Sequence, residues 1–514
     1  MTQTSQNNKR IAKNTVMLYV RMLISMVVRL YTSRVVLQVL GVEDYGIYGV
    51  VGGIVSAFSF FNASMAGATS RFLTYELGKE DKQSLKDTFA SALIIHVGIA
   101  FLILLLSETI GLWFLYNKLN IPEIRMEAAF WVFQFSILSM IVTVTQVPYN
   151  AVIIAHEKLD IYAYIELLNV ILKLVIVYLL VIGDFDKLIL YAALVLAVST
   201  LIALIYRIYC LNHYEESKFK WVWKTSILKP MLSFSGWDLF GNFSVTVTLQ
   251  GYQFAMNMLA GPILNAANNV ANTVQGTIKG LSYNVVQAYR PQIIKQYAKG
   301  NIEQMELLVY DASKICLIML LYVSIPCYWE IDYILKLWLV EPPLYANMLL
   351  SISLISLIFN MANVVINIPI HATGHIKKLS IYTGFFYTIS PFVFYIIAKC
   401  GVPIHLAYWT IVFINILTLS ITITIVKHCI PVFSTVKLIV RCYMPFIPLI
   451  ILDSALICFA KSIISESLIR LFLEIVMSCM LISVYAYFII LTASQKEAIL
   501  KFVKKKCNDV LSSD

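Results

Sequence analysis

Six basic residues lie away from the ends of stretches of this sequence that are otherwise apolar enough to cross a membrane as helices. They are Arg21, Arg29 and Arg34 in the first stretch, and Lys173, Lys279 and Lys314 in later ones. A charge in hydrocarbon is unfavourable, so such residues normally face a water-filled cavity or an anionic partner. Their number indicates a transporter of a negatively charged molecule.

The composition explains why these stretches are taken as helices in a bilayer. Of 514 residues, 60% are hydrophobic and 13% charged, and the mean hydropathy is +0.79. Apolar runs of about 20 residues recur along the chain, the length that crosses a membrane as helix. We predict an all-α polytopic membrane protein with about fourteen transmembrane helices. The predicted spans are 12–40, 45–69, 88–116, 127–150, 161–183, 187–210, 231–259, 262–289, 308–330, 344–370, 379–398, 403–426, 436–460 and 468–492.

The distribution of lysine and arginine predicts the orientation. Roughly two thirds of the 39 basic residues fall on one side if both termini are cytoplasmic, as the positive-inside rule requires. The net charge of +10 is then explained by loops that face anionic lipid, and no nucleic-acid partner is expected.

The sequence lacks the motifs of several cofactor and metal sites. The nine cysteines are scattered and form no C-x-x-C pair, so neither a metal site nor disulfides are predicted. No G-x-x-x-x-G-K-[ST] motif is present, which excludes a Walker-type ATP site. We expect no cofactor. Transport would draw its energy from an ion gradient or the membrane potential.

An internal repeat divides the chain. A shift of 220 residues aligns 158–162 (KLDIY) with 378–382 (KLSIY), and Gly41 with Gly261. Spans one to six and seven to twelve therefore form two pseudo-symmetric six-helix lobes, with two extra C-terminal helices. The predicted domains are an N-terminal lobe at 1–210, a cytoplasmic linker rich in basic and aromatic residues at 211–230, a C-terminal lobe at 231–430, helices thirteen and fourteen at 431–495, and a basic cytoplasmic tail at 496–514.

One predicted span carries a long polar stripe. At 100° per residue, the following side chains fall within a sector about 100° wide: Asn265, Asn268, Asn269, Asn272, Lys279, Tyr283, Gln287 and Arg290. Span 344–370 repeats the pattern with Asn360, Asn363 and Asn367. Such a stripe faces either a wet cavity or the polar groups of a neighbouring helix, and the sequence leaves both interpretations open.

Depth ranks the charged residues. Arg29 lies at least about 16 Å from either end of its span at 1.5 Å per residue, whereas Arg21 and Arg34 are close enough to the ends to snorkel. Glu166 precedes Lys173 by seven residues on the same face and can pair with it. Asp238 and Glu166 are the main carboxylates proposed for ion coupling, and Asp453 and Glu474 are further acidic candidates in spans.

Three segments resemble a known family. They are 14–48, which includes LGVEDYGIY at 40–48, then 68–73 (ATSRFL) and 288–295 (AYRPQIIK). They are similar to Wzx-type O-antigen and polysaccharide flippases of the multidrug/oligosaccharidyl-lipid/polysaccharide exporter superfamily. The resemblance implies a non-enzymatic transporter of the bacterial plasma membrane, with two lobes around a cationic cavity. It would move an undecaprenyl-pyrophosphate-linked oligosaccharide from the inner to the outer leaflet by alternating access.

The resemblance also implies roles for individual residues. Related lipid II flippases carry basic residues in helices one and eight, which by helix and depth correspond to Arg21, Arg29, Arg34 and Lys279 here. With the polar stripes, the expected substrate-binding set is Arg21, Arg29, Arg34, Lys279, Arg290, Asn265, Asn269, Asn272, Asn363 and Asn367. Guanidinium groups would bind the pyrophosphate and amides the sugars. Membrane lipids and the polysaccharide polymerase machinery are the further partners.

Two other functions compete with a flippase. An ion-coupled drug exporter of the same superfamily would need buried carboxylates for a cationic substrate, whereas the predicted cavity is basic. A membrane-embedded polysaccharide polymerase or glycosyltransferase would need a sizeable outer loop with acidic or histidine residues, and the predicted outer loops are short.

The topology is testable by itself. Reporter fusions after Lys82, Lys220 and Lys505 should all give a cytoplasmic signal, because the basic residues set the orientation and each lobe has an even number of spans. The measurement is the ratio of cytoplasmic to periplasmic reporter activity. A periplasmic signal after Lys220 would refute the two-lobe arrangement.

Overall fold

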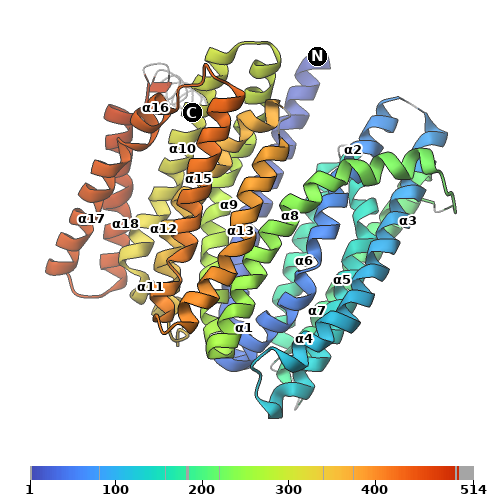
Figure 1. Cartoon of the computed structure of the whole chain (residues 1–514), viewed down its shortest axis with the longest axis horizontal. Coiled ribbons are helices and arrows are strands. Elements are labelled where there is room, and N and C mark those ends of the chain that lie inside the picture. Colours follow the sequence, from blue (N-terminus) through green and yellow to red (C-terminus); the bar gives the residue numbers. More distant parts are fainter. Residues whose placement is uncertain are drawn as a thin grey trace, which may run out of the picture. The chain divides into compact units, whose positions relative to one another are not determined.

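The computed structural model describes residues 3–496 except 80, 157, 181–184, 219, 340, 374–375 and 493–494. Side chains at 3–23 and at a few further helical positions lie outside the described part. The described residues contain helices and turns but no strand (Figure 1). The predicted all-α class is confirmed.

The helices follow one another with short connections. Their bounds are α1 Gln3–Ser56, α2 Ser59–Gly78, α3 Lys82–Leu106, α4 Leu112–Asn117, α5 Met126–Ala155, α6 Leu159–Leu179, α7 Lys187–His213, α8 Thr225–Ala260, α9 Pro262–Ala298, α10 Ile302–Trp329, α11 Ile331–Leu339, α12 Ala346–Thr373, α13 Ile376–Lys399, α14 Ile404–Ala407, α15 Thr410–Cys429, α16 Thr435–Leu438, α17 Phe446–Ile463 and α18 Leu468–Tyr485. Three π-helical turns, 107–111, 439–443 and 486–490, join or extend them.

Eleven segments of the described residues are long and apolar enough to span a membrane. The more polar helices α2, α8 and α9 complete the set of about fourteen predicted spans. Two expectations need correction. Predicted span 45–69 is divided by a turn at 57–58, and its second half continues as α2 to Gly78. A short helix, α11, occupies a predicted outer loop, because Ile331, Leu335 and Leu339 form a buried face at helical spacing.

The chain forms two compact units, and each is described by itself. The first contains 1–273, 341–349 and 380–410, and the second contains 274–340, 350–379 and 411–514. The predicted lobe boundaries at 210 and 231 follow the repeat rather than this division, and they stay predictions.

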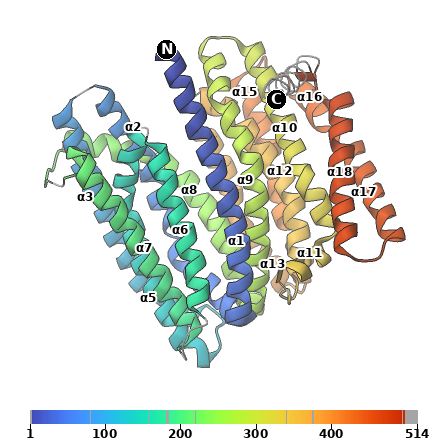
Figure 2. The same ribbon diagram turned by 180° about the vertical axis from the view of Figure 1, so that it is seen from behind.

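Helix α5 is at the centre of the first unit. It packs against α3 and α7, with α7 beside it along its length in Figures 1 and 2. Fully buried Phe133 and Ile137 of α5 belong to a core cluster that includes Val50, Ile54 and Leu188. In the second unit α10 packs against α17 and α18, which lie side by side in both figures.

The two halves share unusual backbone features at equivalent positions. Gly41 interrupts α1 with φ 80° and ψ 169°, and Gly261 ends α8 with φ 73° and ψ −164°. This region of backbone space is open to glycine almost alone. Forty residues further along in each half, Asp81 and Asn301 cap α3 and α10 through their side-chain oxygens. Both pairs differ by the 220-residue shift, which supports the predicted repeat.

These glycines make a test of the turn geometry. Gly41→Ala and Gly261→Ala should each lower the free energy of unfolding by roughly 1–3 kcal/mol, because the methyl group makes the observed φ and ψ unfavourable. Gly98→Ala is the matched control, since Gly98 lies inside α3 with open space around it. Denaturant unfolding in detergent measures all three. Equal effects at Gly98 and Gly41 would contradict the argument.

Candidate functional site

The first part of the polar stripe on α9 is bonded to α8. Asn265 is fully buried, accepts a hydrogen bond from Asn257 at 2.9 Å and donates to the Gln253 carbonyl at 2.6 Å. Asn268 donates to the Gln253 side-chain oxygen, and Gln253 donates to Asn269 at 3.0 Å. Asn265 and Asn268 therefore do not face a wet cavity in this structure. They hold α8 and α9 together, which is the alternative that the sequence left open.

The later part of the stripe differs. Asn272 and Lys279 are half-buried, Tyr283 is exposed and Arg290 is half-buried. No hydrogen bond or ion pair joins Lys279 or Arg290 to another residue in the described part of the chain. Burial is the one influence on the Lys279 ammonium, so no described carboxylate neutralises it. A half-buried cation with no described partner gains favourable electrostatic energy when it binds an anion.

Helix α12 lies beside this part of α9. The Gln275 side chain donates to the Ser353 carbonyl at 3.1 Å, which ties the two helices within the second unit. At about 1.5 Å per residue, Lys279 and Asn360 then lie within about one helical turn of each other in depth.

The three asparagine side chains of α12 that the sequence analysis singled out differ in burial. Asn363 is buried and has an interaction partner. Asn360 donates to Asn415 at 3.2 Å, and Asn367 is half-buried. The side-chain oxygens of Asn360 and Asn367 are buried without a hydrogen-bond donor among the described residues. They can accept hydrogen bonds from a polar cargo or from water.

The basic residues of α1 belong to the first unit. The Arg21 side chain lies outside the described residues, as does that of Asp238. Arg34 is half-buried and has an interaction partner. Arg29 is exposed, and no hydrogen bond or ion pair joins it to another described residue. Arg29 is thus available for a ligand.

Glu166 has described neighbours within the first unit, and its predicted role in ion coupling stays a prediction. It attracts the Lys173 ammonium, which Arg29 repels, and it accepts a hydrogen bond from Tyr206 at 3.1 Å. The predicted set therefore divides between the two units, with Arg29, Arg34 and the α8–α9 amides in the first and Lys279, Arg290, Asn363 and Asn367 in the second.

Sequence reasoning missed Arg207. It lies on α7, donates to the Thr145 hydroxyl at 2.7 Å and stacks 5.8 Å from the Tyr149 ring, and its Nε is buried without an acceptor among the described residues. It lies three residues before the end of the predicted span 187–210, and it is not counted among the basic residues within spans. Counting charges within 187–210 would have found it.

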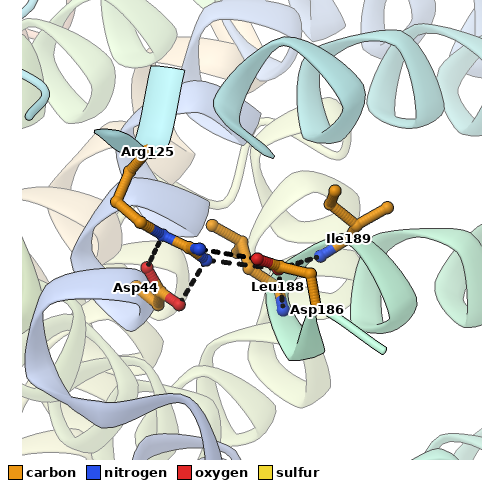
Figure 3. Close-up of polar contacts among 5 residues, drawn as sticks. All are labelled: Asp44, Arg125, Asp186, Leu188 and Ile189. Carbon is orange, nitrogen blue, oxygen red and sulfur yellow. Dashed lines mark hydrogen bonds and ion pairs between the residues drawn. The ribbon is translucent and has the colours of Figure 1, made fainter. Parts of the chain in front are cut away.

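A different set of charges is fully paired at the predicted outer end of the first unit (Figure 3). Arg125 binds Asp44 of α1 through Nε and Nη2 at 2.8 and 2.6 Å, and it binds Asp186 through Nη1 and Nη2 at 2.6 and 3.2 Å. Asp186 also caps α7 by accepting from the amides of Leu188 and Ile189. One guanidinium therefore joins α1, α5 and α7.

The electrostatic effect on Asp186, the carboxyl of the clamp that lies outside the membrane spans, has a clear sign. The hydrogen bond from Arg125 holds the pKa of the Asp186 carboxyl below its ordinary value. The stability that this carboxylate contributes is therefore present above its unfolded pKa and is lost as the pH falls through the lowered one. With all its charges paired, the clamp is structural.

Comparisons with known proteins identify solved structures that have the same fold. No protein-family model and no curated protein matches the sequence. Among solved structures, a lipid II flippase in an inward closed conformation superposes with a TM-score of 0.69 at 11% identity, covering 92% of this chain and 98% of that one. An inward-facing multidrug resistance MATE family transporter gives 0.65 at 13% identity, covering 80% and 100%. A MOP superfamily transporter from Pyrococcus furiosus gives 0.62 at 15% identity, covering 82% and 96%.

These similarities define the fold. The chain is a multi-pass membrane protein, and its fold is the one that these transporter structures have. The structures that superpose include both drug exporters and a lipid II flippase, so the fold by itself does not specify a cargo.

The clamp yields a stability prediction. Arg125→Met should lower the free energy of unfolding by about 2 kcal/mol, because it removes charge-assisted hydrogen bonds from two partly buried carboxylates. The free energy of unfolding of Arg125→Lys should lie between those of the wild type and Arg125→Met, since the charge remains without the bidentate geometry. Lys187→Met, an exposed neighbour, is the control. Unfolding in detergent measures the series, and an unchanged Arg125→Met protein would contradict the clamp.

Proposed function

We propose that this protein is a flippase that moves an undecaprenyl-pyrophosphate-linked oligosaccharide from the inner to the outer leaflet of a bacterial plasma membrane. The product would feed polysaccharide or O-antigen biosynthesis, with the polymerase machinery as the next partner. Both termini would be cytoplasmic. The transporter fold and the unpaired basic residues support this function.

Lys279 is the observation that carries the proposal. A lysine in the interior of a transporter helix would normally have a carboxylate partner if its role were structural. Lys314 illustrates the structural case, since it is buried, attracts the Asp311 carboxylate and donates to the Ile490 carbonyl at 3.1 Å. Lys279 has no such partner among the described residues. The pyrophosphate would supply the missing negative charge.

Other residues contribute to the proposed site. Arg290, in the same unit as Lys279, also has no described carboxylate partner, and guanidinium binds phosphate oxygens in pairs. Arg29 and Arg207, in the first unit, likewise have no described carboxylate partner, and each can bind an anion by itself. The oxygens of Asn360 and Asn367 would accept hydrogen bonds from sugar hydroxyls. Asn265 and Asn269 are left out because α8 already uses their amides.

The extent of the superposition also favours a flippase over a drug exporter. The lipid II flippase covers 92% of this chain, whereas the MATE transporter covers 80%. A drug exporter stays as the alternative, because the MATE transporter still superposes on four fifths of the chain.

Substitution of Lys279 tests the cargo. Lys279→Ala should reduce display of the glycan about tenfold or more in a strain that depends on this protein, because one charge-assisted contact to phosphate is lost. Lys279→Arg should retain most of the activity, since the positive charge remains. Arg29→Ala should likewise reduce display of the glycan. Glycan at the cell surface is measured at matched protein levels.

Two comparisons make this test decisive. Lys82→Ala replaces an exposed lysine at the start of α3 and should export normally. Efflux of a cationic dye by the wild-type protein is measured in parallel. Dye efflux without glycan export would identify a drug exporter, and normal export by Lys279→Ala would remove Lys279 from the site.

A further inference from the structure

Helices α17 and α18, which lie outside the repeat, carry buried carboxyl groups that the proposed cargo does not use. The two helices pack against each other and against α10 in the second unit (Figure 1). On α18 the polar residues Arg470, Glu474 and Ser478 follow one another at four-residue intervals on its buried face. Asp453 of α17 faces the last of them.

Asp453 is fully buried near the middle of its helix. Ser478 donates a hydrogen bond to Asp453 Oδ2 at 2.6 Å, and Oδ1 has no donor among the described residues. Ten residues, or about 15 Å, separate Asp453 from the end of α17 at Ile463. No described lysine or arginine acts on it. An ionised carboxylate at that depth is strongly disfavoured, whereas a carboxylic acid is tolerated.

The neighbouring charges do not supply the missing cation. Arg470 donates to Glu330 at 2.7 Å and Lys461 lies 3.1 Å from the other Glu330 oxygen. Glu474 is fully buried, its carboxylate is 3.6 Å from Arg470 Nε, and neither of its oxygens accepts a hydrogen bond from a described residue. Arg470 and Lys461 thus lie beside Glu330 and Glu474, and no cation of the described residues pairs with Asp453.

We propose that Asp453 is a proton-binding site of the α17–α18 pair, and that Glu474 connects it to the predicted outer ends of these helices. A proton adds to Oδ1, which has no partner, while Oδ2 keeps the bond from Ser478. Glu474 lies one turn from Ser478 on the same face of α18, between Asp453 and the Glu330–Arg470 pair. The proton therefore has a polar route along one face of one helix.

The other titratable groups around the site are few. Cys479 is the one described thiol on which Asp453 acts electrostatically. The charged groups that act on Glu474 are Glu330, Arg470 and Lys461. Several titratable groups that α10 and the 439–443 turn direct toward this helix pair, Tyr310, Asp311, Lys314 and Arg441, interact with one another or with the end of α18 at Ile490. Tyr443 donates to the Ser313 hydroxyl, and Tyr322 of α10 bonds to the Ser483 hydroxyl of α18 at 2.8 Å. None of these groups acts on Asp453 or Glu474 in the described structure.

Infrared spectroscopy of the purified protein tests the proton directly. At neutral pH the wild-type protein should show a carboxylic acid C=O band that disappears in Asp453→Asn. Asparagine has the shape of the protonated acid, so this variant should fold. Ser478→Ala keeps the acid and should shift the band to higher frequency, because the hydrogen bond to Oδ2 is lost. Glu466→Gln, an exposed acid between the two helices, should leave the band unchanged.

The route is tested by exchange of the same band in deuterated water. Glu474→Gln should keep the Asp453 band but slow its shift on deuteration several-fold, because the group that passes the proton is gone. Absence of any band that Asp453→Asn removes would overturn the proton site, and unchanged exchange in Glu474→Gln would overturn the route. Neither measurement uses a cargo, so the result is independent of the flippase assay.

Discussion

The hydrocarbon of the bilayer imposes the constraint on which this structure depends, because each polar group within it needs a partner, a wet cavity or a neutral form. The chain meets this demand in different ways at different depths. Amides pair with amides between α8 and α9, where Asn257, Asn265 and Gln253 bond to one another. The exceptions, such as Lys279 and Asp453, are consequently informative about function.

Ion pairs are concentrated near the helix ends, where charges are less costly than at the membrane centre. Arg125 joins three helices of the first unit through two carboxylates. In the second unit, Glu330 at the end of α10 binds Arg470 and Lys461 and so fastens the α17–α18 pair to α10. Both arrangements resist separation of the helices that they join.

Lys279 and Asp453, which have no oppositely charged partner among the described residues, differ in sign and in neighbours. Lys279 lies on α9 beside the amide-bearing helix α12, whereas Asp453 lies between α17 and α18. A cation that awaits an anion suits cargo binding, and an acid that can hold a proton suits ion coupling. If the protein is a flippase, these two features divide the work of recognising the cargo and supplying the energy between separate helices.

Hydropathy by itself determined the spans and the all-α class, because a helix that crosses hydrocarbon must be apolar over a fixed length. The repeat was equally visible, and Gly41 and Gly261 adopt the same glycine-specific geometry. The sequence left the role of Asn265 open, since a polar face at helical spacing looks the same whether water or another helix covers it. Only the tertiary structure decided that α8 covers Asn265 while Lys279, on the same stripe, has no partner among the described residues.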